Sequence, residues 1–146
     1  MRHLTFKLLG FTIIGLLALP CHATPLPEGW QPLPLPTLSG SFLEHGQRGT
    51  AMLVQNPQQH TYGVAVAAEP ASGATARIVK TFRAIAPNPP QLSLIKPGNY
   101  QPVCHNGGDC APRHIDSEAI SVCFGEASCG IIYADGSAFR EMAVTD

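Results

Sequence analysis

Residues 120–144 read ISVCFGEASCGIIYADGSAFREMAV, and this stretch decides the fold class. Apolar side chains alternate with smaller or polar ones over 120–124, as in a strand with one buried face. The dipeptide Asp135-Gly136 then separates two further strand-like runs, 131–133 and 139–144. Asp-Gly in this position favours a two-residue β-hairpin loop, because glycine readily adopts the positive φ angles of such turns. The stretch therefore predicts successive antiparallel strands.

Similar strand-like runs precede this stretch at 50–54, 61–68, 76–82 and 92–95, with turn-forming residues between them. No window of fifteen residues keeps a helical apolar period with caps at both ends. Strands at a spacing of about ten residues are typical of an all-β antiparallel domain. We therefore predict a single small β domain over residues 40–146, sandwich-like or barrel-like, with six to eight short strands.

The composition limits the class of protein. The chain has 146 residues, of which 45% are hydrophobic and 13% charged, and its formal net charge is −1. This length fits one domain. The weak charge argues against nucleic-acid binding, which needs a basic face to neutralise phosphates. Mean hydropathy near zero argues against disorder and against several membrane spans. We expect no nucleic-acid partner and no membrane span.

The first 23 residues have the features of an export signal. Arg2 and Lys7 give a basic start, residues 8–19 form an apolar run, and small residues precede a cleavage site after Ala23. This run of twelve residues rises about 18 Å as a helix, short of the roughly 30 Å hydrocarbon core of a membrane. We therefore expect a signal peptide over 1–23 and a periplasmic or secreted mature protein.

Cys21 offers a second way to process this segment, as a lipidated first residue. This lipoprotein is the less favoured alternative, because Pro20 stands where such signals carry a small flexible residue. Removal of the 23 residues leaves 7 basic and 10 acidic side chains, and so a net charge of −3. It also leaves four cysteines in an exported chain, where disulfides form readily.

Residues 24–39 form a proline-rich segment, which we expect to be an extended N-terminal arm. Proline fixes φ and removes a hydrogen-bond donor, so closely spaced prolines exclude a helix or a central strand. Trp30 lies within this segment. It could belong to a proline-rich ligand for another protein, but we favour packing of its ring onto the protein's own domain.

The mature cysteines form two pairs of equal spacing, Cys104 with Cys110 and Cys123 with Cys129. Four cysteines allow three connectivities, and the sequence alone does not select one. Local geometry favours pairing within each set, because the intervening segments are short enough to close as a flexible loop and a hairpin. Each small loop would contribute on the order of 2 kcal/mol by the chain-entropy estimate.

A metal site is the competing hypothesis for the first cysteine pair, with these ligands: Cys104, His105, Asp109, Cys110 and His114. Structural zinc sites usually have two to four residues between paired cysteines, whereas five separate this pair. Exported thiols also tend to be oxidised. We therefore expect no metal and no cofactor.

No familiar catalytic motif occurs in the chain: it has no Gly-x-Ser-x-Gly, no His-Glu-x-x-His and no Cys-x-x-Cys-His. We interpret His45, His60, His105 and His114 as exposed loop histidines, because their spacing orients no triad. The 10 carboxylates include no conspicuous pair for acid–base work. We name no catalytic residue and favour a protein that is not an enzyme.

A family resemblance covers most of the mature chain. The string GSFLEHGQRGTAMLV at 40–54 resembles the loop and following strand of FG-GAP or VCBS repeats, the calcium-type repeats of integrin-like β-propellers. LIKPGNY at 94–100, followed by Cys104 and Cys110, is similar to the C-terminal half of small exported single-domain bacterial proteins of this kind. LPEGW at 26–30 resembles their usual start. The family is largely uncharacterised, so the resemblance implies a fold more than an activity.

The chain departs from this family at the calcium loop. The family places oxygen ligands where this chain has Ser41, Leu43, His45 and Gly49. Calcium takes six to eight oxygens, and Glu44 alone cannot replace the missing ones. We therefore predict a retained turn without a calcium site. The second cysteine pair also departs from the family pattern and is interpreted as an added staple across a hairpin.

These observations favour a non-enzymatic exported protein that binds another macromolecule, with a protein partner in the cell envelope. An inhibitor or immunity protein against an envelope-targeting hydrolase is one concrete version. The candidate binding loop is the segment closed by the first cysteine pair, with His105, Asn106 and Asp109. A structural or accessory envelope protein is the alternative, and a small hydrolase with a site assembled only in three dimensions is the third. The oligomeric state stays open.

Overall fold

The computed structural model describes residues 24–70, 73–83, 88–104, 110–126 and 128–144, so the predicted signal peptide lies outside the described residues. The described chain forms strands, turns and one 3-10 turn, η1, at Glu44–Gly46. Its strands are β1 (Gln31–Pro32), β2 (Leu38–Gly40), β3 (Gly49–Asn56), β4 (Thr61–Ala68), β5 (Arg77–Phe82), β6 (Gln91–Ile95), β7 (Gly98–Tyr100), β8 (Arg113–Ile115), β9 (Ala119–Phe124), β10 (Ser128–Asp135) and β11 (Ala138–Ala143). The predicted all-β fold is confirmed. Seven of these strands have five or more residues, and the other four have two or three.

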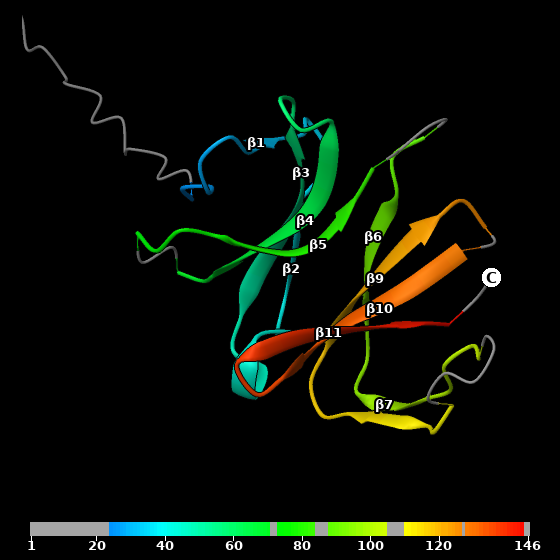
Figure 1. Ribbon diagram of the computed structural model, residues 1–146. Helices are drawn as coiled ribbons and strands as arrows, with labels where there is room; N and C mark the ends of the chain where they lie inside the picture. Colours follow the sequence, from blue (N-terminus) through cyan, green and yellow to red (C-terminus); the bar gives the residue numbers. More distant parts are fainter. Residues whose placement is uncertain (1–23, 71–72, 84–87, 105–109, 127, 145–146) are drawn as a thin grey trace, which may run out of the picture.

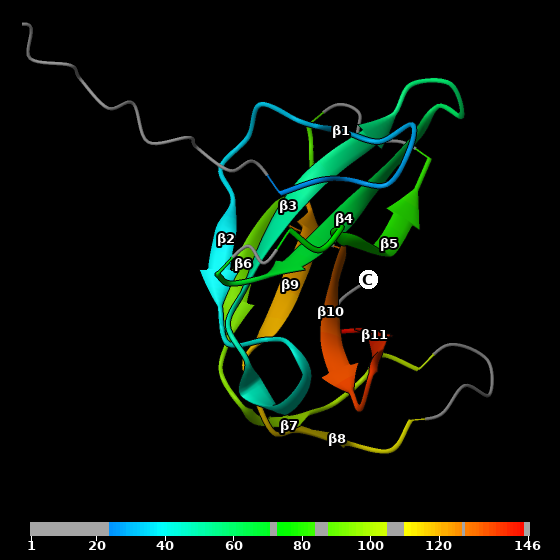
Figure 2. The same cartoon turned by 90° about the vertical axis from the view of Figure 1, so that its left-hand side faces the viewer.

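Two antiparallel sheets face each other (Figure 1). The first has the order β1-β3-β4-β5, and β2 pairs with β3 beside β1. The second has the order β11-β10-β9-β6, and β7 and β8 form a separate two-stranded hairpin. All of these pairs are antiparallel, and short hairpin connections join β3 to β4, β9 to β10 and β10 to β11. In the view turned by 90°, β2 and β6 lie on one side of the sandwich, and β5 and β11 lie on the other (Figure 2).

The main core fills the space between the two sheets. Val64 and Val66 of β4 point into it from the first sheet, and Ile120 and Val122 of β9 point into it from the second. Successive side chains of a strand point to opposite faces, so the residues between these valines belong to the other face of β4. That face is also buried over most of its length. Each sheet therefore has a second apolar face, which needs a cover of its own.

Residues 24–36, which we call the proline cover, lie over the outer face of the first sheet. Leu26 and Trp30 pack against Val54 and Ala65 there. The Ala76 amide donates a hydrogen bond to the Pro25 carbonyl at 2.8 Å, so the start of the cover is tied to the sheet. Trp30 thus packs on its own domain, as favoured from the sequence.

The proline-rich segment also contributes strands to the first sheet. β1 pairs with the end of β3, and β2 pairs with its start, so the boundary expected before residue 40 falls inside β2. Pro32 lies at the sheet edge, where a missing N–H costs no ladder bond. The Leu33 amide still donates to the Leu53 carbonyl at 2.9 Å. The segment is therefore a sheet edge as well as a cover.

The β7–β8 hairpin, which we call the hairpin cover, lies over the outer face of the second sheet. Its Tyr100 and Ile115 pack against Ile131 of β10 and Met142 of β11. Figure 2 shows the two strands running across the lower end of the sandwich. The outer face of the first sheet is therefore covered by the proline cover, and that of the second sheet by the hairpin cover.

The β10–β11 hairpin is confirmed, but its loop is one residue later than predicted. Asp135 pairs with Ala138, so the two loop residues are Gly136 and Ser137. Gly136 has φ +60, which is the conformation that favours glycine at the first loop position. The sequence signal was correct in kind, and the aspartate belongs to the strand.

Side chains join the two sheets along the β5–β11 edge. Lys80 forms an ion pair with Glu141. Arg77 donates to the Ser137 carbonyl at 3.1 Å and stacks over the Phe139 ring at 5.5 Å.

No helix among the described residues is long and apolar enough to cross a membrane.

Backbone proximity joins the sheets along the β2–β6 edge. A Cβ atom added at Gly40 would lie 2.6 Å from the Leu94 side chain, so any larger residue would displace that side chain. The Ser41 amide next to it donates to the Glu118 carboxylate at 2.6 Å. This end of the β2–β6 edge is therefore closed.

Candidate functional site

The two predicted disulfides are both present and both local. Cys123 and Cys129 lie directly opposite each other on β9 and β10, with their Cα atoms 4.1 Å apart. This bond therefore crosses the second sheet inside a hairpin. Cys104 and Cys110 have Cα atoms 5.5 Å apart and close the loop between β7 and β8. Neither Cys104 nor Cys110 is buried, so the Cys104–Cys110 bond lies at the surface.

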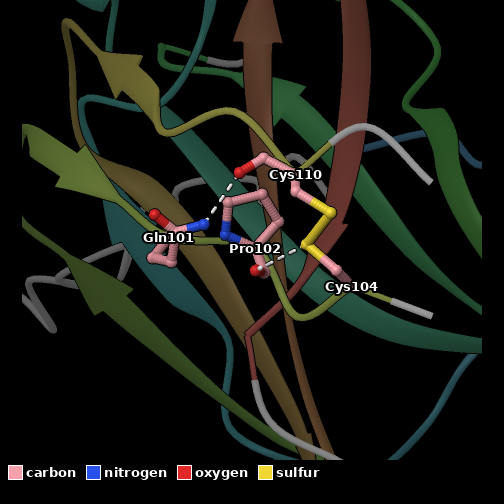
Figure 3. The surroundings of a disulfide bond; sticks show 4 residues. All are labelled: Gln101, Pro102, Cys104 and Cys110. Carbon is pink, nitrogen blue, oxygen red and sulfur yellow. Dashed lines mark hydrogen bonds between the residues drawn. A yellow bond between two sulfur atoms is a disulfide. The ribbon is translucent and has the colours of Figure 1, made fainter. Parts of the chain in front are cut away.

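The base of the Cys104–Cys110 loop is fixed by several contacts (Figure 3). The Gln101 side-chain amide donates to the Cys110 carbonyl at 2.8 Å, from one side of the loop to the other. Cys104 Sγ lies 3.6 Å from the carbonyl oxygen of the buried Pro102. The Val103 amide donates to the Ala143 carbonyl at 2.8 Å, which ties the loop base to the end of β11. The loop thus begins and ends on a defined frame.

The predicted binding residues His105, Asn106 and Asp109 lie outside the described residues, so their positions stay predictions. The cysteines of the competing metal hypothesis are oxidised to a disulfide, and a disulfide sulfur is not a thiolate ligand. His114, the remaining described ligand of that hypothesis, is in strand β8 rather than in a loop. Its Nδ1 lies 2.7 Å from Asn99 Oδ1 on the paired strand β7.

A hollow of about 390 Å³ opens beside the loop base, between the hairpin cover and the β10–β11 hairpin. We call it the arginine hollow, and these residues contribute its lining: Pro102, Val103, Arg113, Tyr133, Arg140 and Met142. Arg113 comes from β8, Tyr133 from β10 and Arg140 from β11. Tyr133 and Arg140 are direct cross-strand partners, and Arg140 also pairs with the exposed Asp135. Sequence reasoning missed this hollow, because its residues meet only when the hairpin cover folds over the sheet.

A second hollow, of about 330 Å³, lies at the η1 end of the sandwich. Glu44 and His45 line it from η1, and Asp116 and Ser117 line it from the segment after β8. His45 has φ +56, an unusual backbone conformation for a residue other than glycine or asparagine. The side chains of His45 and Asp116 are 83% and 94% exposed, so neither is desolvated. In the described part of the chain, no group of three potential ligands is placed to hold a metal ion.

An apolar groove of about 550 Å³ runs between the proline cover and the start of β6. Leucines line it from both sheets, namely Leu35, Leu38, Leu53 and Leu92, together with the neighbouring prolines. None of its lining residues is charged. It lies along the same β2–β6 edge as the close approach of Gly40 to Leu94.

A cluster around Glu69 fastens β2 to the β3–β4 hairpin. The Glu69 carboxylate accepts hydrogen bonds from Thr50 of β3 and, at 2.8 Å, from Ser39 of β2, and Arg48 lies 3.4 Å away. The Thr50 hydrogen bond and then the Ser39 hydrogen bond hold the pKa of Glu69 below its ordinary value, with help from the positive charge of Arg48. The carboxylate form therefore stabilises this corner.

The turn expected at the calcium-type loop is retained. Gly46 donates to Leu43 at 3.0 Å, and Gln47 donates to Glu44 at 3.2 Å. Leu43 packs against the main core. No family model, curated protein or solved structure matches this chain. The resemblance to FG-GAP and VCBS-repeat proteins therefore stays a prediction.

Proposed function

We propose that the protein is an exported, non-enzymatic protein that binds a protein partner of the cell envelope through the Cys104–Cys110 loop. One observation carries the proposal: a disulfide at the surface closes a loop that stands on a fixed base. The core does not need this bond for packing, because neither cysteine is buried. Its effect is to restrict the loop between them.

A restricted loop favours binding because fewer conformations are lost when the partner docks. Ordering of a flexible side chain costs about 0.5–1.5 kcal/mol, so a loop that is ordered in advance binds more tightly for the same contacts. The disulfides also fit an oxidising compartment, which agrees with export. Inhibition of an envelope-targeting hydrolase, as by an immunity protein, is the concrete version of the proposal.

A capture experiment with wild type and two variants tests the loop. The purified exported protein is immobilised, and an envelope extract is passed over wild type and over the variant His105→Ala/Asn106→Ala/Asp109→Ala. We expect one stoichiometric partner on wild type and none on the variant. Glu28→Ala/Gln31→Ala is the matched control, because both residues are exposed on the proline cover, at the opposite face. Retention of the partner by the loop variant contradicts the proposal.

Removal of the disulfide separates the loop's contacts from its restriction. Cys104→Ser/Cys110→Ser keeps all three proposed contact residues, so binding should weaken by about tenfold rather than disappear. The inhibitory version is tested with a panel of peptidoglycan hydrolases. Their activity should fall in proportion to added protein, up to one equivalent, and a panel left fully active removes that version.

The hollow at η1 favours a second candidate function, a small hydrolase. It brings a histidine, two carboxylates and Ser117 to one concave surface. The exposure of His45 and Asp116 makes this candidate the weaker one, since general bases and nucleophiles are usually activated by burial and oriented partners. Turnover of chromogenic esters or of peptidoglycan that is lost in both His45→Ala and Ser117→Ala would support the hydrolase instead.

A further inference from the structure

The apolar groove between the proline cover and β6 is a place where the main core reaches the surface. Its lining includes Leu53, a buried member of that core, together with Leu38 of β2 and Leu92 of β6, which pack against it. Leu35 also lines the groove and is 36% exposed. No other large hydrophobic side chain in the described part of the chain is exposed to this degree. The covers of the sandwich therefore leave apolar surface open to solvent here.

The strand beside this groove, β6, has an open edge. Among the described residues, β6 pairs only with β9, and no further backbone hydrogen bond reaches it. In an antiparallel pair, every second residue directs its N–H and C=O groups away from the partner strand. Gly40 of β2 lies against Leu94 and closes one half of this outer edge. The other half, residues 91–93, begins in the lining of the groove, to which Gln91 and Leu92 contribute.

β6 also lacks the usual protection of an edge strand. Charged side chains and prolines on an edge strand oppose its pairing with another chain. In the described sheets, the other edge strands of five or more residues carry charges, namely Arg77 and Lys80 in β5 and Arg140 and Glu141 in β11. These two strands are also joined to each other by side chains. β6 reads QLSLI and has neither a charge nor a proline.

The lining of the groove indicates which chemistry fits it. None of its residues is charged or aromatic. A charged side chain that entered the groove would lose its hydration without gaining an opposite charge, so a matching segment is uncharged there. Proline-rich ligands dock in aromatic-lined grooves, and a helix uses its backbone groups internally. An extended segment fits both features, because its backbone can pair with β6 while every second side chain enters the groove.

We propose that β6 and the apolar groove bind an extended, uncharged segment of another protein as an added strand, with aliphatic side chains of that segment in the groove. Such a segment alternates aliphatic residues with small polar ones. Prolines restrict the walls of the groove at Pro36, Pro89 and Pro90, so little conformational freedom is lost there on binding.

This surface is separate from the Cys104–Cys110 loop. β6 and β11 are opposite edges of the second sheet, and the base of the loop is tied to β11 through the hydrogen bond from Val103 to Ala143. Figure 2 shows β6 beside β2, on the side of the sandwich opposite β11. The inference therefore goes beyond the proposed function and does not depend on it.

A synthetic peptide tests the added strand. The probe is acetyl-Thr-Leu-Thr-Val-Thr-Leu-Thr-amide, which alternates aliphatic and uncharged polar side chains. It is titrated into the isotope-labelled exported protein and followed by backbone amide NMR and hydrogen exchange. We expect a Kd of about 100 μM, shifts at residues 91–93, and slower exchange of at least one of these amides. Absence of shifts at 91–93, or shifts there without slower exchange, overturns the inference.

Altered peptides separate backbone pairing from side-chain contacts. One peptide is N-methylated at the valine and both leucines, and another at the two inner threonines. Because a strand pairs through one edge, only one of these peptides should lose affinity, by at least tenfold. An equal effect of the two contradicts strand addition. Aspartate in place of the valine should also weaken binding at least tenfold, since the groove holds no opposite charge.

Variants of the protein test the groove without altering the core. Leu35→Glu places a carboxylate beside the bound segment and should weaken the peptide at least tenfold, whereas Leu35→Met should retain it. Gln31→Glu is the matched control, because it adds the same charge at an exposed position that does not line the groove. Thermal unfolding checks that the three variants are folded. Equal affinity of Leu35→Glu and Gln31→Glu contradicts the site.

Two further measurements identify the kind of occupant. Sedimentation of the protein alone should show a monomer at the concentration used for the titration. A dimer that Leu35→Glu dissociates would assign the edge of β6 to a second copy of this chain and contradict the proposal. Octyl glucoside below its micellar concentration should leave residues 91–93 unshifted. Shifts as large as those caused by the peptide would assign the groove to small apolar molecules and also contradict it.

Discussion

The two covers of the sandwich solve the same problem by different means. Each hides an apolar outer face of a sheet, with Trp30 and Leu26 on one side and Tyr100 and Ile115 on the other. The proline cover is a single pass of chain, restricted by its own prolines and held by a few backbone hydrogen bonds. The hairpin cover is two paired strands whose far end is closed by a disulfide.

The difference shows how stability can be separated from binding. The proline cover leads into β2, which is fastened by the Glu69 carboxylate, whereas the hairpin cover carries a covalent bond at the surface. Acid should therefore loosen the first, and a reductant should loosen the second. The surface disulfide Cys104–Cys110 belongs to the hairpin cover, so we expect the proposed partner on that side of the molecule.

Among single substitutions, the largest effect should come from Trp30→Ala in the proline cover. The ring is partly buried against Val54 and Ala65, so we expect a loss of about 2 kcal/mol in the free energy of unfolding, below the range for a fully buried tryptophan. Urea unfolding measures it, with exposed Gln31→Ala as the control. A loss no larger than in the control would show that the proline cover is dispensable.

Removal of either disulfide should lower the free energy of unfolding by about the same amount. The two pairs enclose loops of equal length, so the chain-entropy estimate gives about 2 kcal/mol for Cys104→Ser/Cys110→Ser and for Cys123→Ser/Cys129→Ser. Thermal unfolding of the two double variants tests this equality. If only Cys123→Ser/Cys129→Ser lowers the stability, the Cys104–Cys110 bond restricts its loop without stabilising the fold.

Acid should weaken the attachment of β2 before it affects the hairpin cover. Because the folded pKa of Glu69 is lowered, its contribution to stability is present above its unfolded pKa, near 4.5, and is lost as the pH falls through the lower folded value. Hydrogen exchange of the Ser39 amide between about pH 7 and about pH 3 measures this, after correction for intrinsic exchange. Glu69→Gln should remove the dependence, and Glu126→Gln, an exposed change of equal charge, should retain it.

The smallest expected effect is that of calcium on the η1 turn between β2 and β3. Leu43 packs against the core where the repeat has an oxygen ligand, so micromolar calcium should leave the melting temperature unchanged. Magnesium at the same concentration is the control. A rise of several degrees in the melting temperature with calcium but not with magnesium would contradict this prediction and indicate a calcium site at the η1 turn.

Local signals made the strands and disulfides predictable. Alternation over 120–124 and the glycine turn at 136 depend on neighbours in sequence, and the short spacing of each cysteine pair limits its geometry. The two loop residues are Gly136 and Ser137 instead of the predicted Asp135 and Gly136, which is a shift of one residue. The turn type sets this position. Prolines correctly excluded a central strand for residues 24–39, but they allowed edge strands.

Long-range contacts could not be predicted in the same way. Arg113 and Arg140 line the same hollow because one hairpin folds over another, and no periodicity in the sequence indicates that arrangement. His45 and Asp116 come together at the η1 end for the same reason. The sequence pattern also did not indicate that both faces of β4 are buried. The structure shows this, because Trp30 and Leu26 pack on the outer face.

The Cys123–Cys129 bond affects how the protein responds to proteolytic cleavage. Gly125 and Glu126 are exposed at the tip of its hairpin, where a protease can reach the chain. Cleavage there would not release the C-terminal strands, since the bond still joins β9 to β10. The nicked molecule would migrate as one species until it is reduced, and would then separate into two. Cys104–Cys110 gives the β7–β8 loop the same tolerance, so a partner could be bound by a chain that is already cut.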